Sequence, residues 1–272
     1  ISASSASTDD PRDWVGFGKV KHEIPKIYAI PTTSGTGSEA TMGAVISDPV
    51  SHEKGVISGA TLLPAAAALD PDLILGLPAP ITAATGMDAL THGIEAYIGL
   101  WERGTRIEHS RAAIKLVFDN LVTACDDGSN RDARGAMSVA ACYAGIAINQ
   151  VNVGNVHAIA HQLGGKYGIP HGMANALVLP GVLEFCREES QQQLAELALL
   201  VGAGNEGDSE EQLSHAFIQA VRDLRTAVHL PDHSDKIRAV DYDHIADLAL
   251  AECEGYPVPR LLDRDSTFAI LA

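Results

Sequence analysis

The sequence lacks any hydrophobic run long enough to cross a membrane. A transmembrane helix needs about 20 consecutive apolar residues, and no window of this 272-residue chain approaches that length. The opening residues, Ile-Ser-Ala-Ser-Ser-Ala-Ser, contain neither the basic nor the apolar segment of a signal peptide. We therefore expect a cytoplasmic protein that has no membrane partner.

Basic residues are also scarce. The chain contains 19 Lys and Arg residues against 35 Asp and Glu residues, which gives a formal net charge of -16. A field of that sign repels phosphate backbones and anionic lipid surfaces. Because the sequence contains no basic patch that would overcome this repulsion, we expect no nucleic-acid partner.

Cysteine is the third scarce residue type. The chain has 4 cysteines and no Cys-X-X-Cys pair; they are Cys125, Cys142, Cys186 and Cys253. This spacing argues against a disulfide framework and a cysteine zinc site, and it favours reduced thiols. Hydrophobic residues make up 46% of the chain, which suits a domain with a buried core and excludes disorder over most of its length.

What the sequence does contain falls into two regions. Residues 1–15 are small, polar and acidic, which predicts a flexible end. Short apolar runs then predict β-strands, two of them flanking turn residues at 48–53; the runs are 27–30, 44–48, 54–58 and 66–70. We therefore expect a β-rich segment over residues 16–78.

From residue 79 onward the sequence has the periodicity of helices. Residues 82–99 repeat apolar positions at spacings of three and four, and Thr82 is available as an N-cap. Further helices are expected at 105–124, 131–149, 156–164, 174–186, 190–202, 209–226 and 242–254. The β-rich segment is thus followed by an all-helical domain over residues 79–272.

Several histidines and one aspartate interrupt these helices at regular spacing. Asp88 and His92 are four residues apart, as are His157 and His161, so each pair projects from one face of its helix. His171 follows a turn and stands where the next helix is expected to start. Two facing helices and a loop could thus bring one carboxylate and three imidazoles to one point.

Each of these residues also has a plain structural interpretation. A lone histidine is most often a satisfied core or surface residue, and the pair His157 and His161 lacks the glutamate of the His-Glu-X-X-His zinc motif. A metal site gains support because the polar groups lie in otherwise apolar helices, where an unpartnered charge is costly. Carboxylate and imidazole ligands without thiolate suit Fe²⁺ or Zn²⁺, and both stay open.

Three segments carry a resemblance to a known family. They are residues 31–39 (PTTSGTGSE), residues 85–97 (TGMDALTHGIEAY), and residues 157–165 (HAIAHQLGG) with Pro170-His171-Gly172. In this order they resemble the iron-containing (group III) alcohol dehydrogenases, from about Trp14 to residues 259–262. The resemblance implies a dehydroquinate synthase-like architecture, in which an α/β remnant of an NAD(P)-binding domain precedes a C-terminal helical metal-binding domain.

The resemblance also implies an activity and its residues. A divalent metal, Fe²⁺ or alternatively Zn²⁺, would be held by Asp88, His92, His157 and His171, and His161 would be the catalytic residue that relays a proton. NAD or NADP would be lined by Thr32, Thr33, Thr36 and Thr41, with Lys54 at its ribose. The implied reaction is hydride transfer between a small alcohol or aldehyde and the nicotinamide.

One part of the family pattern is missing. The family begins with an α/β half that carries a glycine-rich pyrophosphate turn and an acidic residue that selects the cofactor ribose. The chain before Ile27 is shorter than the ~30 residues of one βαβ unit. We expect a fragment of a longer enzyme; a natural truncation, or a second chain that supplies the missing half, are the alternatives.

Two other functions stand beside the alcohol dehydrogenase interpretation. One is a truncated, non-catalytic helical module for metal binding or oligomerisation. The other is a maleylacetate-reductase-like enzyme, which resembles metal-independent members of the superfamily. The complete set of one aspartate and three histidines favours the iron-type branch. Because an exposed sheet edge needs cover, we also expect a homodimer.

Overall fold

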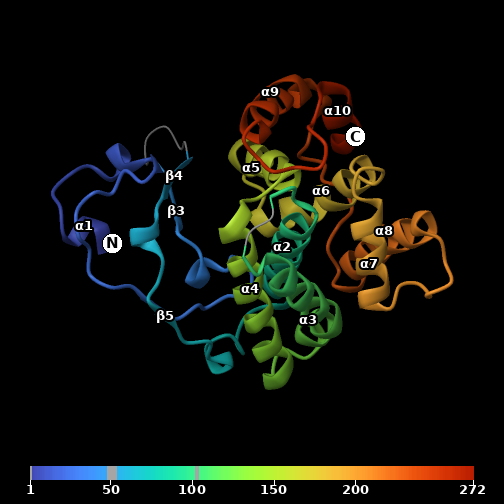
Figure 1. The fold of residues 1–272 in the computed structure, drawn as a ribbon, viewed down its shortest axis with the longest axis horizontal. Helices are drawn as coiled ribbons and strands as arrows, with labels where there is room; N and C mark the ends of the chain where they lie inside the picture. Colours follow the sequence, from blue (N-terminus) through green and yellow to red (C-terminus); the bar gives the residue numbers. More distant parts are fainter. Residues whose placement is uncertain (1, 48–53, 102–103) are drawn as a thin grey trace.

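The computed structural model describes residues 2–47, 54–101 and 104–272, and the side chains of Ser47 and Lys54 fall outside this description. Strands and short turns occupy the N-terminal part (residues up to 78), and long helices occupy the rest (Figure 1). The expected fold class, an α/β remnant followed by an all-helical domain, is confirmed.

Three strands form a small mixed sheet. Its order is β1–β4–β3, with β1 at Gly16–Phe17, β4 at Lys54–Ser58 and β3 at Gly43–Ser47. β1 pairs with β4 in parallel, and β3 pairs with β4 antiparallel. The expected hairpin is therefore confirmed, while its turn at 48–53 lies outside the described residues.

A second sheet contains two parallel strands, β2 (Tyr28–Ala29) and β5 (Ala66–Ala67). The start of the chain packs beside the strands through α1 (Ser2–Ser5) and a 3-10 turn at Pro11–Trp14. The side chain of Trp14 is buried in a small apolar core that residues of the N-terminal part form. The flexible end expected over residues 1–15 stays a prediction.

The helices enclose one large apolar core. Their bounds are α2 Ala79–Ile98, α3 Arg106–Asp126, α4 Arg131–Val151, α5 Asn155–Tyr167, α6 His171–Phe185, α7 Gln191–Val201, α8 Glu210–Ala227, α9 Tyr242–Cys253 and α10 Arg264–Leu271. The helices expected from periodicity are present within a few residues of their predicted ends. The periodicity does not predict α10.

The N-cap expected at Thr82 is wrong. α2 begins three residues earlier, after Pro78, and Pro80 occupies its first turn, a position that suits the fixed φ of proline. The hydroxyl of Thr82 donates to the Pro78 carbonyl at 3.2 Å and accepts a bond from the Arg134 guanidinium at 2.5 Å. The hydroxyl therefore links α2 to α4.

α2 runs through the middle of the helical domain, and every residue from Met87 to Ile98 is buried. It packs against α3, α4 and α6. Glycine permits the closest of these approaches, because a Cβ at Gly172, in the first turn of α6, would lie 2.1 Å from the carbonyl oxygen of Ala84. The start of α6 is thus pressed directly onto α2.

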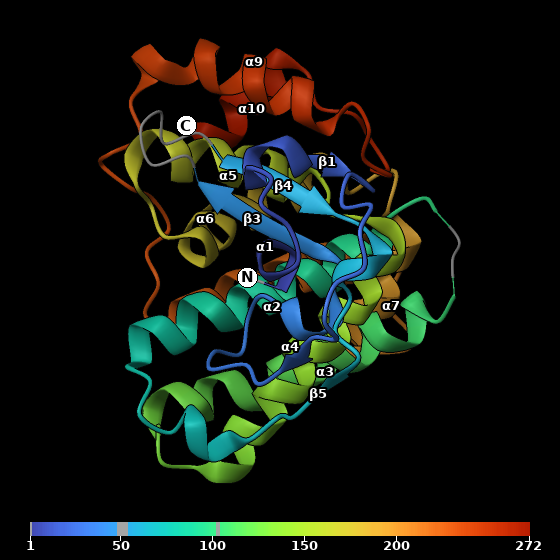
Figure 2. The ribbon, with the colours of Figure 1, turned by 90° about the vertical axis from the view of Figure 1, so that its left-hand side faces the viewer.

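The N-terminal part lies against one side of the helical domain, as Figure 2 shows with β3 and β4 toward the viewer and α9 and α10 at the top. The join is made by a loop at residues 31–40, called here the glycine loop. Its Ser34 hydroxyl lies 3.2 Å from the Ser138 hydroxyl of α4. Just beyond it, the Met42 amide donates to Asn149 of the same helix at 2.9 Å.

Within the described residues, no single helix has the length and apolar content needed to span a membrane. Helices α4 and α5 meet that test only as a pair, and they are bent by 106° where they join.

Candidate metal centre

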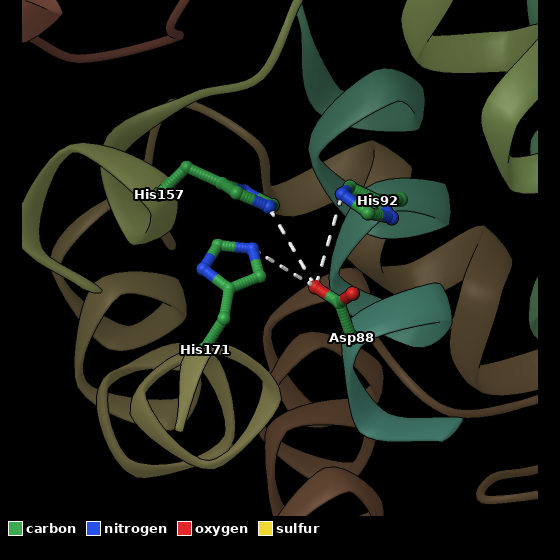
Figure 3. Close-up of side chains that lie close together, drawn as sticks. All are labelled: Asp88, His92, His157 and His171. Atoms are coloured by element: carbon green, nitrogen blue, oxygen red, sulfur yellow. Dashed lines mark ion pairs between the residues drawn. The ribbon is translucent and has the colours of Figure 1, made fainter. Parts of the chain in front are cut away.

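Three helices bring four potential ligands together. α2 supplies Asp88 and His92 from adjacent turns, α5 supplies His157, and α6 supplies His171 as its first residue. Figure 3 shows the four side chains pointing toward one another across the gap between these helices. We call this group the Asp/His cluster. The convergence expected from the sequence is therefore present.

The spacing within the cluster suits a shared ion. The Asp88 Oδ1 atom lies 3.8 Å from Nε2 of His92, 3.8 Å from Nε2 of His157 and 3.4 Å from Nε2 of His171. These distances are too long for good direct hydrogen bonds. Ligands at ~2.1 Å from a tetrahedral ion lie ~3.4 Å apart, so the donor set matches one small divalent cation. Each residue offers one ligand atom, and these atoms lie within 4.8 Å of one another.

The local electrostatics favour the metal-binding protonation states of two ligands, Asp88 and His157. Burial opposes the charge of Asp88, but the imidazoles of His92, His171 and His157 outweigh it and lower the pKa of the carboxyl. Burial, with the neighbouring imidazoles, lowers the pKa of His157 well below its ordinary value. An ionised carboxylate and a neutral imidazole are the ligand forms that bind metal ions.

Glu95, which is absent from the set of residues predicted from the sequence, contacts His157 on the ring nitrogen that faces away from the cluster. The Glu95 Oε2 atom lies 2.5 Å from Nδ1 of His157 and accepts a bond from the Gly154 amide at 2.9 Å, while Oε1 accepts one from the Val156 amide at 2.7 Å. Burial raises the pKa of Glu95 to about 7. A carboxylate on Nδ1 leaves Nε2 free for a metal, which is a common arrangement around metal-binding histidines. In the sequence, the one indication of a role for Glu95 is its position on a buried helix, three residues after His92.

Asn175 is a second residue that sequence reasoning misses. It lies one turn after His171 on α6, and its Nδ2 atom donates to Asp88 Oδ1 at 2.7 Å. The same atom lies 3.3 Å from Nε2 of His157 and 3.3 Å from Nε2 of His171. Asn175 therefore holds the Asp88 carboxylate in place among the ligand nitrogens.

His161 lies beside the cluster and is not one of its four members. Its ring centroid is 5.7 Å from that of His157 and 5.3 Å from that of His171, and its side chain is 33% exposed. His161 thus lies next to two ligand residues and is itself partly open to solvent. Its expected role in proton relay stays a prediction.

The threonines expected at the cofactor lie in or near the glycine loop. Thr32 and Thr36 are exposed, whereas Thr33 and Thr41 are partly buried. The loop touches α2 close to the cluster, because a Cβ at Gly35 would lie 2.7 Å from Cβ of Thr85, one turn before Asp88. Lys54, the remaining residue expected at the cofactor, has its side chain outside the described part of the structure.

The glycines of this loop have a packing role. A Cβ at Gly37 would lie 2.6 Å from Cα of Gly145 on α4, and Gly37 also has a φ of +59°, which glycine adopts readily. These glycines let the loop approach α2 and α4 closely. Cofactor binding by the four threonines stays a prediction.

Comparison with known proteins agrees with this geometry. Residues 82–272 match a profile described as "Fe-containing alcohol dehydrogenase family, C-terminal", and residues 1–71 match one described as "Iron-containing alcohol dehydrogenase". The chain is 37% identical over 262 residues to a 1,3-propanediol dehydrogenase of Citrobacter freundii, and the alignment covers 96% of this chain and 68% of that protein.

Solved structures share the fold. A 1,3-propanediol oxidoreductase superposes with a TM-score of 0.95 at 36% identity, over 100% of this chain and 72% of the other. A sulfoacetaldehyde reductase from Bifidobacterium kashiwanohense, solved in complex with NAD⁺, superposes with a TM-score of 0.87 at 25% identity, over 99% of this chain and 70% of the other. The chain therefore belongs to the iron-containing alcohol dehydrogenase family of oxidoreductases.

Proposed function

We propose that the Asp/His cluster is the catalytic metal centre of an NAD(P)-linked enzyme that interconverts small alcohols and aldehydes. The observation that carries this proposal is the convergence of four ligand atoms, three of their side chains buried. Asp88, His92, His157 and His171 are the proposed ligands. Fe²⁺ is the proposed ion because of the family, with Zn²⁺ as the alternative that the same donor set accommodates.

Residues of the chain itself would position the ligands and move the proton. When bound, a divalent metal supplies a Lewis acid that polarises an alcohol or carbonyl oxygen. Glu95 holds His157 with Nε2 directed into the cluster, and Asn175 fixes the Asp88 carboxylate. His171, whose side chain is 37% exposed, marks the side of the cluster that solvent and substrate reach. His161 moves the proton between the substrate oxygen and water.

We further propose that the nicotinamide cofactor approaches from the glycine loop, lined by Thr32, Thr33, Thr36 and Thr41. Support comes from the contact of this loop with α2 one turn before Asp88. It also comes from the structurally similar reductase that was solved with NAD⁺. The names of the propanediol relatives favour short-chain alcohols and diols as substrates.

The domain boundary and assembly are proposals of the same kind. We place the boundary between residues 78 and 79, supported by the start of α2 at Ala79 and by the two profile matches on either side of it. A homo-oligomer is supported by the exposed edge strand β3, on which Val45 is 63% exposed. A cytoplasmic location is supported by the free state of the cysteines.

Metal analysis and turnover test the proposed function directly. Protein purified without oxygen should contain about one divalent metal per chain, because four ligands complete one site. With NADH or NADPH it should reduce a three-carbon aldehyde, and fluorescence should report cofactor binding. Metal-free protein from such a preparation would overturn the metal centre. A metal-loaded chain that binds neither cofactor would instead favour a non-catalytic metal-binding module.

A further inference from the structure

The side chain of His161 is fixed by a helix that contributes nothing to the Asp/His cluster. Its Nδ1 atom lies 2.6 Å from Oε1 of Glu252, a residue of α9 that is 91 positions away in sequence. Helices α5 and α9, which carry these two residues, pack against each other. The side chains of the two residues are 33% and 25% exposed, so water competes only partly for their hydrogen bond.

Two further donors complete the coordination of the Glu252 carboxylate. The Tyr256 hydroxyl donates to Oε1 at 2.7 Å, and the Gln162 amide donates to Oε2 at 2.7 Å. Burial and the nearby carboxylate raise the pKa of Tyr256, so its hydroxyl keeps the proton that it donates. Both oxygens of Glu252 therefore accept hydrogen bonds, one from the segment just after α9 and one from α5.

This arrangement selects one tautomer of the neutral imidazole. A carboxylate only accepts hydrogen bonds, so the nitrogen of His161 that faces it must carry the proton. The proton then resides on Nδ1 and the lone pair on Nε2. The His161 ring is also held nearly parallel to the ring of His171, with an interplanar angle of 20°.

We propose that Glu252 is a positioning residue, which fixes both the tautomer and the orientation of His161 so that Nε2 is the nitrogen available for proton transfer. The proposal rests on the proposed function in one respect, namely that His161 moves the substrate proton. The geometry of the hydrogen bonds does not depend on that role. A carboxylate on the far nitrogen performs the same task for many metal-binding histidines, as Glu95 does here for His157.

The tautomer of His161 can be measured by NMR, independently of enzyme activity. In the full chain labelled with ¹⁵N in its histidine rings, long-range ¹H–¹⁵N correlation spectra distinguish a protonated from an unprotonated ring nitrogen. The signals of His161 are assigned by their loss in His161→Ala. We expect protonated Nδ1 and unprotonated Nε2 in the wild type, and a mixture of both tautomers in Glu252→Gln. Glu252→Asp, which keeps the carboxylate, should restore part of the Nδ1 preference.

Tyr256→Phe provides the matched control. It removes one bond to the same carboxylate but leaves the bond to His161, so the wild-type tautomer should persist. A wild type protonated on Nε2, or a Glu252→Gln variant with the wild-type pattern, would overturn the proposal.

Kinetics then separate this inference from the proposed function. In Glu252→Gln we expect kcat to fall about tenfold, part of the usual contribution of a general acid or base, with KM and metal content unchanged. Loss of metal in proportion to activity would show a structural role instead and would overturn the proposal. Absence of turnover in the metal-loaded wild type would overturn the proposed function, while the tautomer measurement would still decide the role of Glu252.

Discussion

A single hydrogen bond determines which nitrogen of His157 is available to a metal. Nδ1 faces the Glu95 carboxylate, and Glu95 in turn is fixed by the backbone amides of Gly154 and Val156. Those amides belong to the first turn of α5 and the residue just before it, where helical N–H groups have no partner within the helix. One buried carboxylate therefore caps α5 and sets the tautomer of the ligand that α5 carries.

Removing the charge of Glu95 should weaken metal binding. In Glu95→Gln the amide group is no longer restricted to accepting, so Nδ1 of His157 loses its obligatory acceptor and Nε2 is no longer always unprotonated. We expect metal affinity to fall about 10- to 100-fold, measured by competition with a chelator. Glu206→Gln, at an exposed site, is the control and should bind as the wild type does. Equal affinities in both variants would contradict this role for Glu95.

His171 and His161 should respond differently to the same substitution. His171 offers a ligand atom to the cluster, so His171→Ala should abolish stable metal binding. His161 stands outside the four ligands, so His161→Ala should keep its metal and lose turnover, by about 100-fold for a proton-transfer residue. Elemental analysis and steady-state kinetics on both variants test this. Equal loss of metal in the two would show that the roles are wrongly assigned.

At the scale of single residues, the sequence predicts only those site residues that have a partner at helical spacing nearby in the chain. Asp88 and His92 reveal themselves as a pair on one helix face, and so do His157 and His161. Glu252 carries no such signal, since its partner lies 91 positions away. Long-range partners are set by how α5 packs on α9, and no short window contains that information.

At the scale of elements, the cluster depends on how closely α6 approaches α2. A Cβ at Gly172 would lie 2.1 Å from the Ala84 carbonyl oxygen and 3.3 Å from Cβ of Asp88. The neighbouring residue, His171, is the first residue of α6 and the most exposed ligand. A small shift of α6 would thus move one ligand away from the other three.

Gly172→Ala should therefore impair both stability and metal binding. Overpacking of this kind costs about 1–3 kcal/mol, and in a chain of this size each kcal/mol lowers Tm by roughly 2–4 °C. Thermal unfolding and metal titration measure the two effects. Gly165→Ala is the control, because Gly165 lies in the last turn of α5 and a Cβ there meets nothing within 4 Å. If Gly172→Ala bound metal like the control, the close approach of α6 would not matter for the site.

Periodicity predicts the long helices well because each buries one apolar face against the common core. Their ends are less predictable. Thr82 has the chemistry of an N-cap, but two prolines upstream start α2 three residues earlier. Helix α10 spans only 8 residues and begins at a capping box formed by Asp263 and Ser266. A pattern that short contains about two helical turns, too few for periodicity to stand out.

At the scale of the whole molecule, the glycine loop is the main joint between the two parts. A Cβ at Gly145 would lie 2.5 Å from the carbonyl oxygen of Gly37, so two glycines allow backbone to meet backbone across the joint. The Ser34–Ser138 and Met42–Asn149 bonds flank this contact. The Asp/His cluster lies wholly on the other side of the joint, on α2, α5 and α6.

Loosening the joint should therefore separate cofactor binding from metal binding. Gly145→Ala places a methyl group against Gly37, at a cost of about 1–3 kcal/mol, which should raise cleavage of the loop by a protease about tenfold to hundredfold. Gly135→Ala on the same helix is the control, because its Cβ would lie at an ordinary 3.9 Å from Pro71.

Metal affinity should be unchanged in both variants, since no ligand lies in the N-terminal part. Cofactor affinity should fall only in Gly145→Ala, because the threonines proposed to line the cofactor move with the loop. A parallel loss of metal would mean that the N-terminal part supports the cluster directly, and that the two parts act as one unit.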